Sequence, residues 1–323
     1  MSSEIHARQQ LAIGKKEQTK LENSTVCIVG VGGTGCAVAG LLGRAGVDLI
    51  LIDRDIVEKS NLGRQILYTE KDIGTLKAIA AKKNILAANS DAKITTITDE
   101  LKAENAERFL NTDLIIDCTD NIAARFLINE VSLKKKIPWI YTGAIKNEGM
   151  VAIFSGAGKP CFRCMVPRVP KAGSLEICST AGVLGPLPSV VGSIAARSAI
   201  KTLLGHSENG KLLKIDDTFE MLNIKGREWC DTCKKEFPIL TGRENLEKAM
   251  QFCGAIVLKS DVPFSEARKR MKKNSKIISS SGTAIVAEHK NSKVILLKSG
   301  KIIFRNVRTK KEANIIYSKL IGN

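Results

Sequence analysis

Residues 24–47 read STVCIVGVGGTGCAVAGLLGRAGV, and this stretch determines the fold class. It begins as a β-branched apolar run, breaks at glycines and continues with small apolar residues at helical spacing, which predicts a strand, a tight turn and a helix. The turn fits the pattern G-x-G-x-x-G, with glycines at positions Gly30, Gly32, Gly33 and Gly35. Such glycines allow phosphate to approach backbone N–H groups at a helix N-terminus. We therefore predict a nucleotide site here, which the glycines alone do not assign to NAD or ATP.

Strand-like and helix-like segments alternate after this turn. DLILIDRD (48–55), AKITTITDE (92–100) and TDLIIDCTDN (112–121) predict strands, and GTLKAIAAKKNILAAN (74–89) and KAENAERFLN (102–111) predict helices between them. IPWIYTGAI and GMVAIFSG add two further strands. This order predicts a Rossmann-like, doubly wound α/β fold with a mainly parallel sheet, whose ligands bind at the carboxyl ends of the strands.

The pattern changes beyond residue 244. Residues 245–323 contain 17 Lys and Arg against 5 Asp and Glu, in a chain whose net charge is +17. EARKRMKKN predicts a basic helix, KVILLKSGKIIFRNV a hairpin that turns at Ser299–Gly300, and TKKEANIIYSKLIG a closing helix. We predict a large nucleotide-binding α/β domain over 1–244 and a small basic α+β domain over 245–323. Its charge indicates an acidic partner, protein or RNA, or only a solvated lysine-rich surface.

Two uncharged runs, 26–43 and 178–196, approach the length of a membrane span, but glycines and prolines interrupt both. The N-terminus MSSEIHARQQ contains no apolar core of the signal-peptide type. We therefore predict a cytoplasmic protein without a membrane span, whose cysteines are reduced, metal-bound or catalytic.

Polar side chains follow the predicted strands. Asp53 ends the second strand and is placed to accept a hydrogen bond from a ribose hydroxyl. SNLGRQ supplies Asn61, Arg64 and Gln65, and Lys77 follows near the start of a helix. An Arg and a Lys that converge on a phosphate site suit an enzyme that cleaves a triphosphate, although either alone is more often a surface cation.

The segment DCTDN, residues 117–121, ends a strand at the same edge. We assign Asp120 to Mg²⁺ binding, because Mg²⁺ needs only one or two carboxylates and keeps most of its waters. Asn121 is assigned to cofactor binding, and Asp117 is interpreted as a cap or a hydrogen-bond partner of the loop.

Two C-x-x-C pairs lie far apart in the chain, Cys161 with Cys164 and Cys230 with Cys233. Paired knuckles of this kind predict a tetrahedral Cys₄ zinc site, with redox dithiols or chance as alternatives. Four protein ligands leave no open position, so this zinc would be structural.

GVGGTG, LIDRD, SNLGRQ, GTLKA, DCTDN, CFRC and CDTC occur in this order between about residue 8 and residue 235. Together they resemble the ThiF/MoeB/HesA family, the prokaryotic relatives of ubiquitin-activating enzymes. The resemblance implies adenylation, with ATP and Mg²⁺, of the C-terminal glycine carboxylate of a ubiquitin-like or sulfur-carrier protein ending in Gly-Gly. It also implies a homodimer and a sulfur donor such as a cysteine desulfurase or a rhodanese.

By position, the resemblance assigns Asp53 to the ribose, Asp120 to Mg²⁺, and the phosphates to Asn61, Arg64, Gln65 and Lys77. Family members commonly open with Arg-x-x-Arg-Gln, whose second arginine reaches the ATP of the other subunit. IHARQQ keeps Arg8 and Gln9 but has Ile5 at the first arginine position. Arg8 is therefore the expected residue donated across a dimer.

The chain contains three histidines, and none lies in the motifs assigned to the nucleotide site. An attacking carboxylate has a pKa of about 3.5 and is already ionised at neutral pH, so it needs no general base. This argues against an NAD-binding oxidoreductase, which stays an alternative together with a tRNA-modifying, carboxylate-activating dehydratase of the same superfamily.

Cys178 lies in GSLEICSTAG, among small and polar residues. Family members often carry a cysteine at this C-x-x-A-G-V position, and in some it forms a thioester or acyl-disulfide with the activated carrier. A thiol near a helix N-terminus and cationic ATP ligands has a lowered pKa. The alternative is a non-essential loop cysteine.

Overall fold

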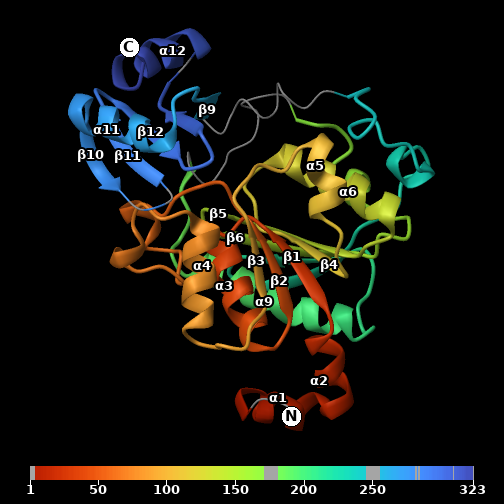
Figure 1. The fold of residues 1–323 in the computed structure, drawn as a ribbon. Coiled ribbons are helices and arrows are strands. Elements are labelled where there is room, and N and C mark those ends of the chain that lie inside the picture. Colours follow the sequence, from red (N-terminus) through yellow and green to blue (C-terminus); the bar gives the residue numbers. More distant parts are fainter. Residues whose placement is uncertain are drawn as a thin grey trace.

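The computed structural model describes residues 4–170, 181–244, 255–280, 282, 284–307 and 309–322. These residues form one eight-stranded and one five-stranded sheet, each with its own helices (Figure 1). The predicted Rossmann-like α/β fold with a small α+β appendage is confirmed. Because residues 245–254 are not described, the boundary at 244/245 stays a prediction.

The first sheet combines a parallel half with an antiparallel half. Its order is β3 (Ile94–Ile97), β2 (Asp48–Ile52), β1 (Thr25–Val29), β4 (Leu114–Asp117), β5 (Trp139–Ile145), β6 (Glu148–Phe154), β7 (Lys211–Ile215) and β8 (Phe219–Asn223). All pairs from β3 to β5 are parallel, and those from β5 to β8 are antiparallel. The central position of β1, between β2 and β4, places the glycine turn at the middle of the carboxyl edge.

Helices cover both faces of the sheet at β1 and β4, which are buried on both sides. Val26 and Ile28 pack with α3 (Gly33–Arg44), α4 (Lys77–Leu86) and α9 (Leu187–Leu203). Cys27 and Val29 point to the opposite face, where α5 (Ala103–Phe109), α6 (Ile122–Lys135) and α7 (Phe162–Met165) supply the partners. This alternation follows from the two-residue period of a strand.

Short helices complete the first domain. At the N-terminus, η1 (Glu4–His6), α1 (Ala7–Ile13) and α2 (Lys15–Glu22) lie at the end of the molecule opposite the second sheet (Figure 1). The 3₁₀ turns η2 (Lys59–Asn61), η3 (Glu70–Asp72) and η4 (Thr232–Lys234) lie in connections. No helix in the described ranges is long and apolar enough to span a membrane.

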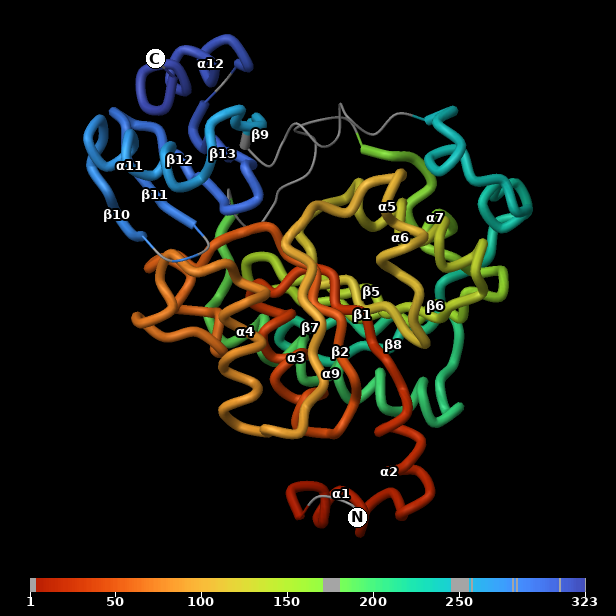
Figure 2. Tube along the Cα trace, viewed as in Figure 1, coloured from red at the N-terminus to blue at the C-terminus, as the bar shows by residue number. Residues whose placement is uncertain are grey.

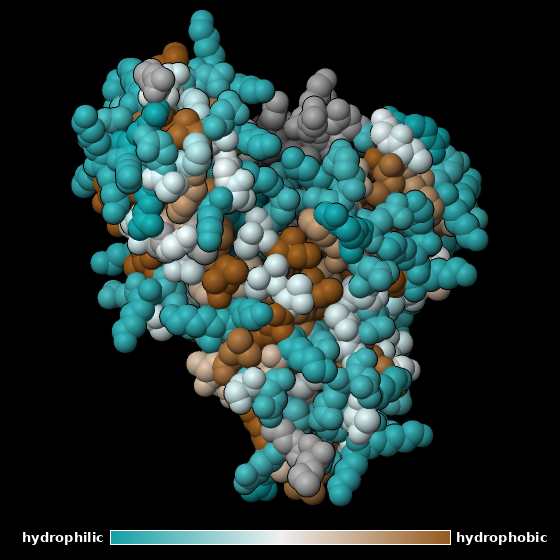
Figure 3. Space-filling model, in the orientation of Figure 1, coloured by the Kyte–Doolittle hydropathy of each residue, from teal (hydrophilic) through white to brown (hydrophobic). Residues whose placement is uncertain are grey.

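The second sheet is antiparallel throughout. Its order is β10 (Lys276–Ser280), β11 (Ala284–His289), β12 (Ser292–Leu297), β13 (Lys301–Arg305) and β9 (Ala255–Lys259). The helices α11 (Phe264–Asn274) and α12 (Lys310–Leu320) pack on one face. The predicted hairpin is present between β12 and β13, with Gly300 at a φ of 81°. Figure 3 shows that the visible surface of this lobe is mostly hydrophilic.

The other face of the second sheet packs on the first domain. Val286, Ile295 and Ile303 form a buried apolar cluster with Ile56 and Leu76, which precede η2 and α4. In Figure 2 the blue second sheet accordingly lies beside the orange segment that follows β2. This contact brings the C-terminal residues of β13 to the carboxyl edge of the first sheet.

Candidate active site

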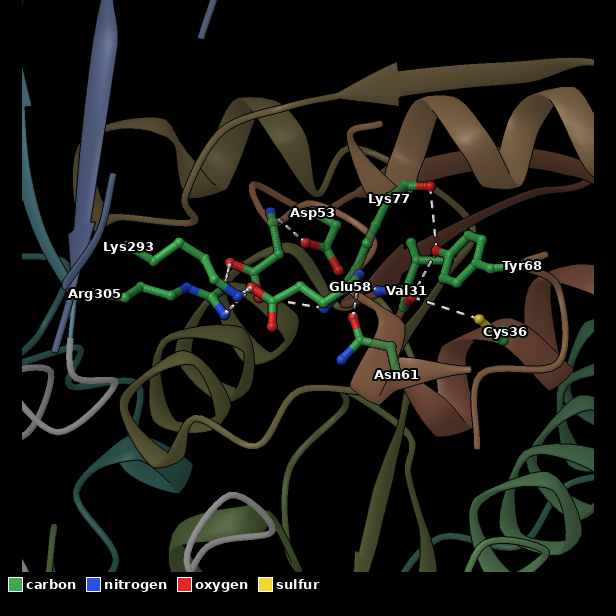
Figure 4. Close-up of polar contacts among 10 residues, drawn as sticks. Val31, Cys36, Asp53, Glu58, Asn61, Tyr68, Lys77, Lys293 and Arg305 are labelled. Carbon is green, nitrogen blue, oxygen red and sulfur yellow. Dashed lines mark hydrogen bonds and ion pairs between the residues drawn. The ribbon is translucent and has the colours of Figure 1, made fainter. Parts of the chain in front are cut away.

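The turn between β1 and α3 depends on two glycines. Gly30 has a φ of 89°, a conformation that side chains rarely adopt. A Cβ at Gly35 would lie 2.0 Å from the Gly30 carbonyl oxygen. The Tyr68 hydroxyl supports the turn, since it donates to the Val31 carbonyl at 2.8 Å (Figure 4). The N-terminus of α3 is therefore held against the end of β1.

A cavity of about 520 Å³ opens at the carboxyl ends of β1, β2 and β4. This size is ordinary for a small-molecule site. The structure brings most of the predicted nucleotide-binding residues to its wall, namely Gly30, Gly32, Gly33, Asp53, Asn61, Arg64, Gln65, Lys77, Asp120 and Asn121. Gly35 does not line the cavity and acts instead through the turn.

Asp53 is held by the backbone. Its Oδ2 accepts a hydrogen bond from the Val31 N–H at 2.8 Å, and its Oδ1 accepts one from the Asp55 N–H at 2.7 Å. Burial and the nearby Asp55 charge raise the pKa of Asp53, and Lys77 opposes this rise. The carboxylate thus ties the end of β2 to the glycine turn, and Asp53 also lines the cavity.

Lys77 is the buried cation of the site. It begins α4, and its Nζ lies 3.3 Å from Asp55 Oδ2. Burial lowers the pKa of this ammonium, but Asp55 and Asp53 outweigh burial and raise it above its usual range. Lys77 is therefore charged at neutral pH and can meet an anion in the cavity.

Asn61, Arg64 and Gln65 occupy the loop that η2 begins. The Asn61 side chain accepts from the Glu58 N–H at 3.0 Å, and Arg64 Nη1 donates to the Ser60 carbonyl at 3.0 Å. Gln65 is 3% exposed, and its Oε1 has no hydrogen-bond partner among the described residues. A buried amide atom without a partner at the cavity wall fits a site that a polar ligand completes.

Asp117 and Asp120 have different surroundings. Asp117 is fully buried and accepts from Arg125 Nε at 3.0 Å and from the Thr119 N–H at 3.0 Å, which agrees with its interpretation as a partner of the loop. Asp120 is exposed at the cavity, and one accessible carboxylate there suits a hydrated Mg²⁺. Asn121 also lines the cavity, but its side chain caps α6 by accepting from the Ala123 N–H at 2.9 Å.

Two buried cysteines near the turn are not nucleophiles. Cys118 lines the cavity, and burial raises the pKa of its thiol well above the usual value. Burial likewise raises the pKa of Cys36 to about 12. Both thiols are therefore neutral at neutral pH, whereas nucleophilic attack requires a thiolate. Cys178 lies outside the described residues.

Arg8 does not reach the cavity of its own chain. It is exposed on α1, and in Figure 1 this helix lies at the far end of the molecule from the second sheet. Arg8 is not among the residues that line the cavity. Its predicted role, which is donation to another subunit, stays a prediction.

The four knuckle cysteines meet in one cluster away from the cavity. Their Sγ atoms lie within 4.8 Å of one another, with Cys161 and Cys230 at 3.6 Å and Cys164 and Cys233 at 3.6 Å. A tetrahedral zinc with bonds of about 2.3 Å requires sulfur–sulfur edges of about 3.8 Å. The four residues therefore fit a closed zinc site that joins the start of α7 to the segment around η4.

Sequence reasoning did not identify six charged residues of the cavity, which are Arg54, Asp55, Asp99, Glu100, Arg125 and Arg305. Asp55 lies in the quoted LIDRD motif, and Arg125 follows DCTDN by one helical turn. Both residues could therefore have been found from the motifs that predicted the nucleotide site. Arg305 belongs to the second sheet and has no sequence signal that connects it with a nucleotide site.

Comparison with known proteins places residues 6–234 within the model of the ThiF family. The chain is 36% identical to the sulfur carrier protein adenylyltransferase of Thermus thermophilus, over 75% of this chain and 92% of that protein. It is also 36% identical to the adenylyltransferase and sulfurtransferase MOCS3 of Aedes aegypti, over 75% of this chain. The match spans 56% of that MOCS3, so the chain corresponds to little more than half of it.

Solved structures of E. coli MccB resemble the fold. The MccB complex with N-formylated MccA gives a TM-score of 0.64 at 22% identity, over 72% of this chain and 75% of that one. This likeness supports the fold of the first domain. The second sheet, which begins at Ala255, lies outside the residues that the family model matches.

We expect Gly35→Ala to destabilise the protein by about 1–3 kcal/mol or more, because the added methyl group overlaps a backbone carbonyl. Thermal unfolding should show a melting temperature several degrees lower. Gly32→Ala is the matched control, since its Cβ would meet only the Gln65 side chain, at 3.9 Å. Equal melting temperatures for both variants would contradict the proposed constraint.

We expect about one zinc ion per chain, and Cys230→Ser should lower both the zinc content and the melting temperature, because one ligand of four is lost. Elemental analysis of the purified protein measures the metal. Cys27→Ala removes a buried cysteine outside the cluster and should retain zinc. The assignment would be wrong if the wild-type protein contained no zinc, or if both variants lost the same amount of zinc.

Proposed function

Because this chain belongs to the ThiF family, we propose that it is an adenylyltransferase that activates the C-terminal glycine carboxylate of a small ubiquitin-like sulfur carrier with ATP and Mg²⁺. The name of its relative in Thermus thermophilus supports a sulfur carrier as the substrate. A carrier that ends in Gly-Gly would place a thin, flexible tail in the cavity.

One observation carries the proposal. The cavity joins a glycine turn at a helix N-terminus with the cations Lys77 and Arg64, the buried amide of Gln65 and the exposed carboxylate of Asp120. Backbone N–H groups and fixed cations stabilise the charge that develops on phosphates, and a carboxylate can hold the metal that bridges them. A dehydrogenase would also use the glycine turn, but it cleaves no phosphate bond and therefore needs no metal-binding carboxylate there.

In the proposed reaction, a carboxylate oxygen of the carrier attacks the α-phosphorus of ATP. A new bond forms between the carboxylate oxygen and the α-phosphorus, which gives a mixed anhydride. The bond between the α-phosphorus and the α,β-bridging oxygen breaks, and pyrophosphate leaves with that oxygen. No proton needs to be removed, because a C-terminal carboxylate with a pKa of about 3.5 is already ionised. The products are a carrier acyl-adenylate and pyrophosphate.

The residues of the cavity have separate tasks in this reaction. Asp53 orients the ribose, while Asn61, Arg64, Gln65 and Lys77 bind the phosphates and stabilise the charge on the leaving pyrophosphate. Asp120 would hold Mg²⁺, which when bound neutralises phosphate charge. Cys161, Cys164, Cys230 and Cys233 would hold a structural zinc, which would support the fold away from the cavity.

Partners complete the proposal. A homodimer would let Arg8 of one subunit approach the ATP of the other, and a cysteine desulfurase or a rhodanese would supply sulfur to the activated carrier. A cytoplasmic location, where thiols stay reduced, is consistent with the cysteine cluster.

A tRNA substrate has less support, because Lys293, Lys301 and Arg305 of the basic domain pair with acids of the first domain.

We expect ATP–pyrophosphate exchange that depends on a Gly-Gly-ending carrier, and we expect Lys77→Ala to lower its rate about 100-fold or more. The physical reason is the loss of a buried cation at the phosphates. Lys82→Ala removes a lysine from the same helix that does not line the cavity, and it is the matched control. Exchange without a carrier, or none with any Gly-Gly-ending carrier, would contradict the proposed substrate.

Cys178→Ala should leave the exchange unchanged, because attack on the α-phosphorus needs no thiol. A carrier–enzyme thioester or acyl-disulfide, detected by mass spectrometry under non-reducing conditions, should disappear in the same variant if Cys178 accepts the carrier. If the variant also loses exchange, the separation between an adenylating site and a later thiol step is wrong.

A further inference from the structure

The second domain contributes side chains to the nucleotide cavity. Arg305, at the end of β13, and Asn306 line the cavity together with Asp53, Asp55 and Lys77. Figure 4 shows Lys293 and Arg305 extending from the second sheet toward Glu58. These residues lie outside the part of the chain that the ThiF family model matches, so the family does not account for their presence.

The second domain is docked at this place by apolar and charged contacts. Ile295 and Ile303 are buried against Ile56 and Leu76 of the first domain. Around this cluster, Lys293 Nζ lies 3.0 Å from Glu58 Oε1, and Lys301 pairs with Asp99. Arg305 is therefore held at the cavity by a domain contact that does not depend on Arg305 alone.

Arg305 and Lys77 share one carboxylate. Arg305 Nη2 lies 2.8 Å from Asp55 Oδ1, while Lys77 Nζ lies 3.3 Å from Asp55 Oδ2. The two cations thus bind opposite oxygens of Asp55. Arg305 Nη1 also lies 3.3 Å from Glu58 Oε1, so Arg305 faces two acids, of which Asp55 lines the cavity where a polyanion would bind.

This arrangement affects how Lys77 can act. With Arg305 present, Asp55 keeps a cationic partner when Lys77 turns toward a phosphate. Without Arg305, Lys77 would have to leave an unpaired, partly buried carboxylate, and that carboxylate would repel the incoming ATP.

We propose that Arg305 is a positioning residue for ATP: by binding Asp55, it leaves the Lys77 ammonium available for the phosphates, so the second domain forms part of the nucleotide site. The proposal rests on the proposed function, because it takes ATP as the ligand. It differs from a direct contact, since Arg305 acts through the charge of Asp55.

The protonation state of Asp55 supports this role. Burial raises the pKa of its carboxyl, but Lys77, Arg305 and Arg54 outweigh burial and hold the pKa below its ordinary range. Asp55 therefore stays charged at neutral pH and competes for Lys77 unless another cation binds it.

The test is a double-mutant cycle on the full-length protein, with the ATP dissociation constant measured by calorimetry in the presence of Mg²⁺. We expect Arg305→Ala to weaken ATP binding about tenfold when Asp55 is present. In an Asp55→Asn background, the same change should alter binding by less than about twofold, because the Asp55 charge that competes for Lys77 is already absent. Arg305→Lys should restore part of the lost affinity. In the exchange assay, Arg305→Ala should raise the KM for ATP and leave kcat at saturating ATP nearly unchanged.

Lys293→Ala is the matched control for domain docking. Lys293 pairs with Glu58 across the same interface but does not line the cavity, so ATP binding should remain close to wild type. Three results would overturn the proposal: an unchanged affinity in Arg305→Ala, a loss that persists in the Asp55→Asn background, or an equal loss in Lys293→Ala. A wild-type protein that shows neither ATP binding nor carrier-dependent exchange would instead overturn the proposed function.

Discussion

The close approach of Gly35 to the Gly30 carbonyl is the constraint on which the site depends. Since a Cβ at Gly35 would lie 2.0 Å from that oxygen, α3 can start directly at the end of β1 only with glycine at this position. The turn leaves the Val31 N–H for Asp53 and the Val31 carbonyl for Tyr68. This steric contact therefore holds the N-terminus of α3 near Asp53, which follows β2, and near Tyr68, which precedes α4.

The parallel half of the first sheet could be predicted from the sequence because its signals are local. There, β1, β2 and β4 are nearly continuous apolar runs, and each is followed by a helix with its own periodicity. The strands β7 and β8 were not predicted, because their apolar residues do not alternate with a clear core face. Every residue of β8 is exposed, so only pairing with β7 defines it as a strand.

The same distinction separates the predicted site residues from those that were missed. Asn61, Gln65 and Lys77 lie in motifs whose spacing reflects a single βα unit, and the structure places all three at the cavity. Arg305 follows Asp55 by 250 positions and resembles any cation at the end of a strand. Arg305 reaches the cavity only because the second sheet packs on Ile56 and Leu76, and no local sequence pattern predicts that contact.

The ion pairs between the two domains change the interpretation of the basic charge in residues 245–323. A surplus of Lys and Arg over residues 245–323 indicated an acidic partner, protein or RNA. Part of that partner is the first domain of the same chain, since Lys293, Lys301 and Arg305 pair with Glu58, Asp99 and Asp55. Because Asp55 and Asp99 line a cavity suited to a polyanion, leaving them unpaired would oppose ligand binding. The basic domain thus balances the acidic rim of the site, and its net charge alone is weak support for nucleic-acid binding.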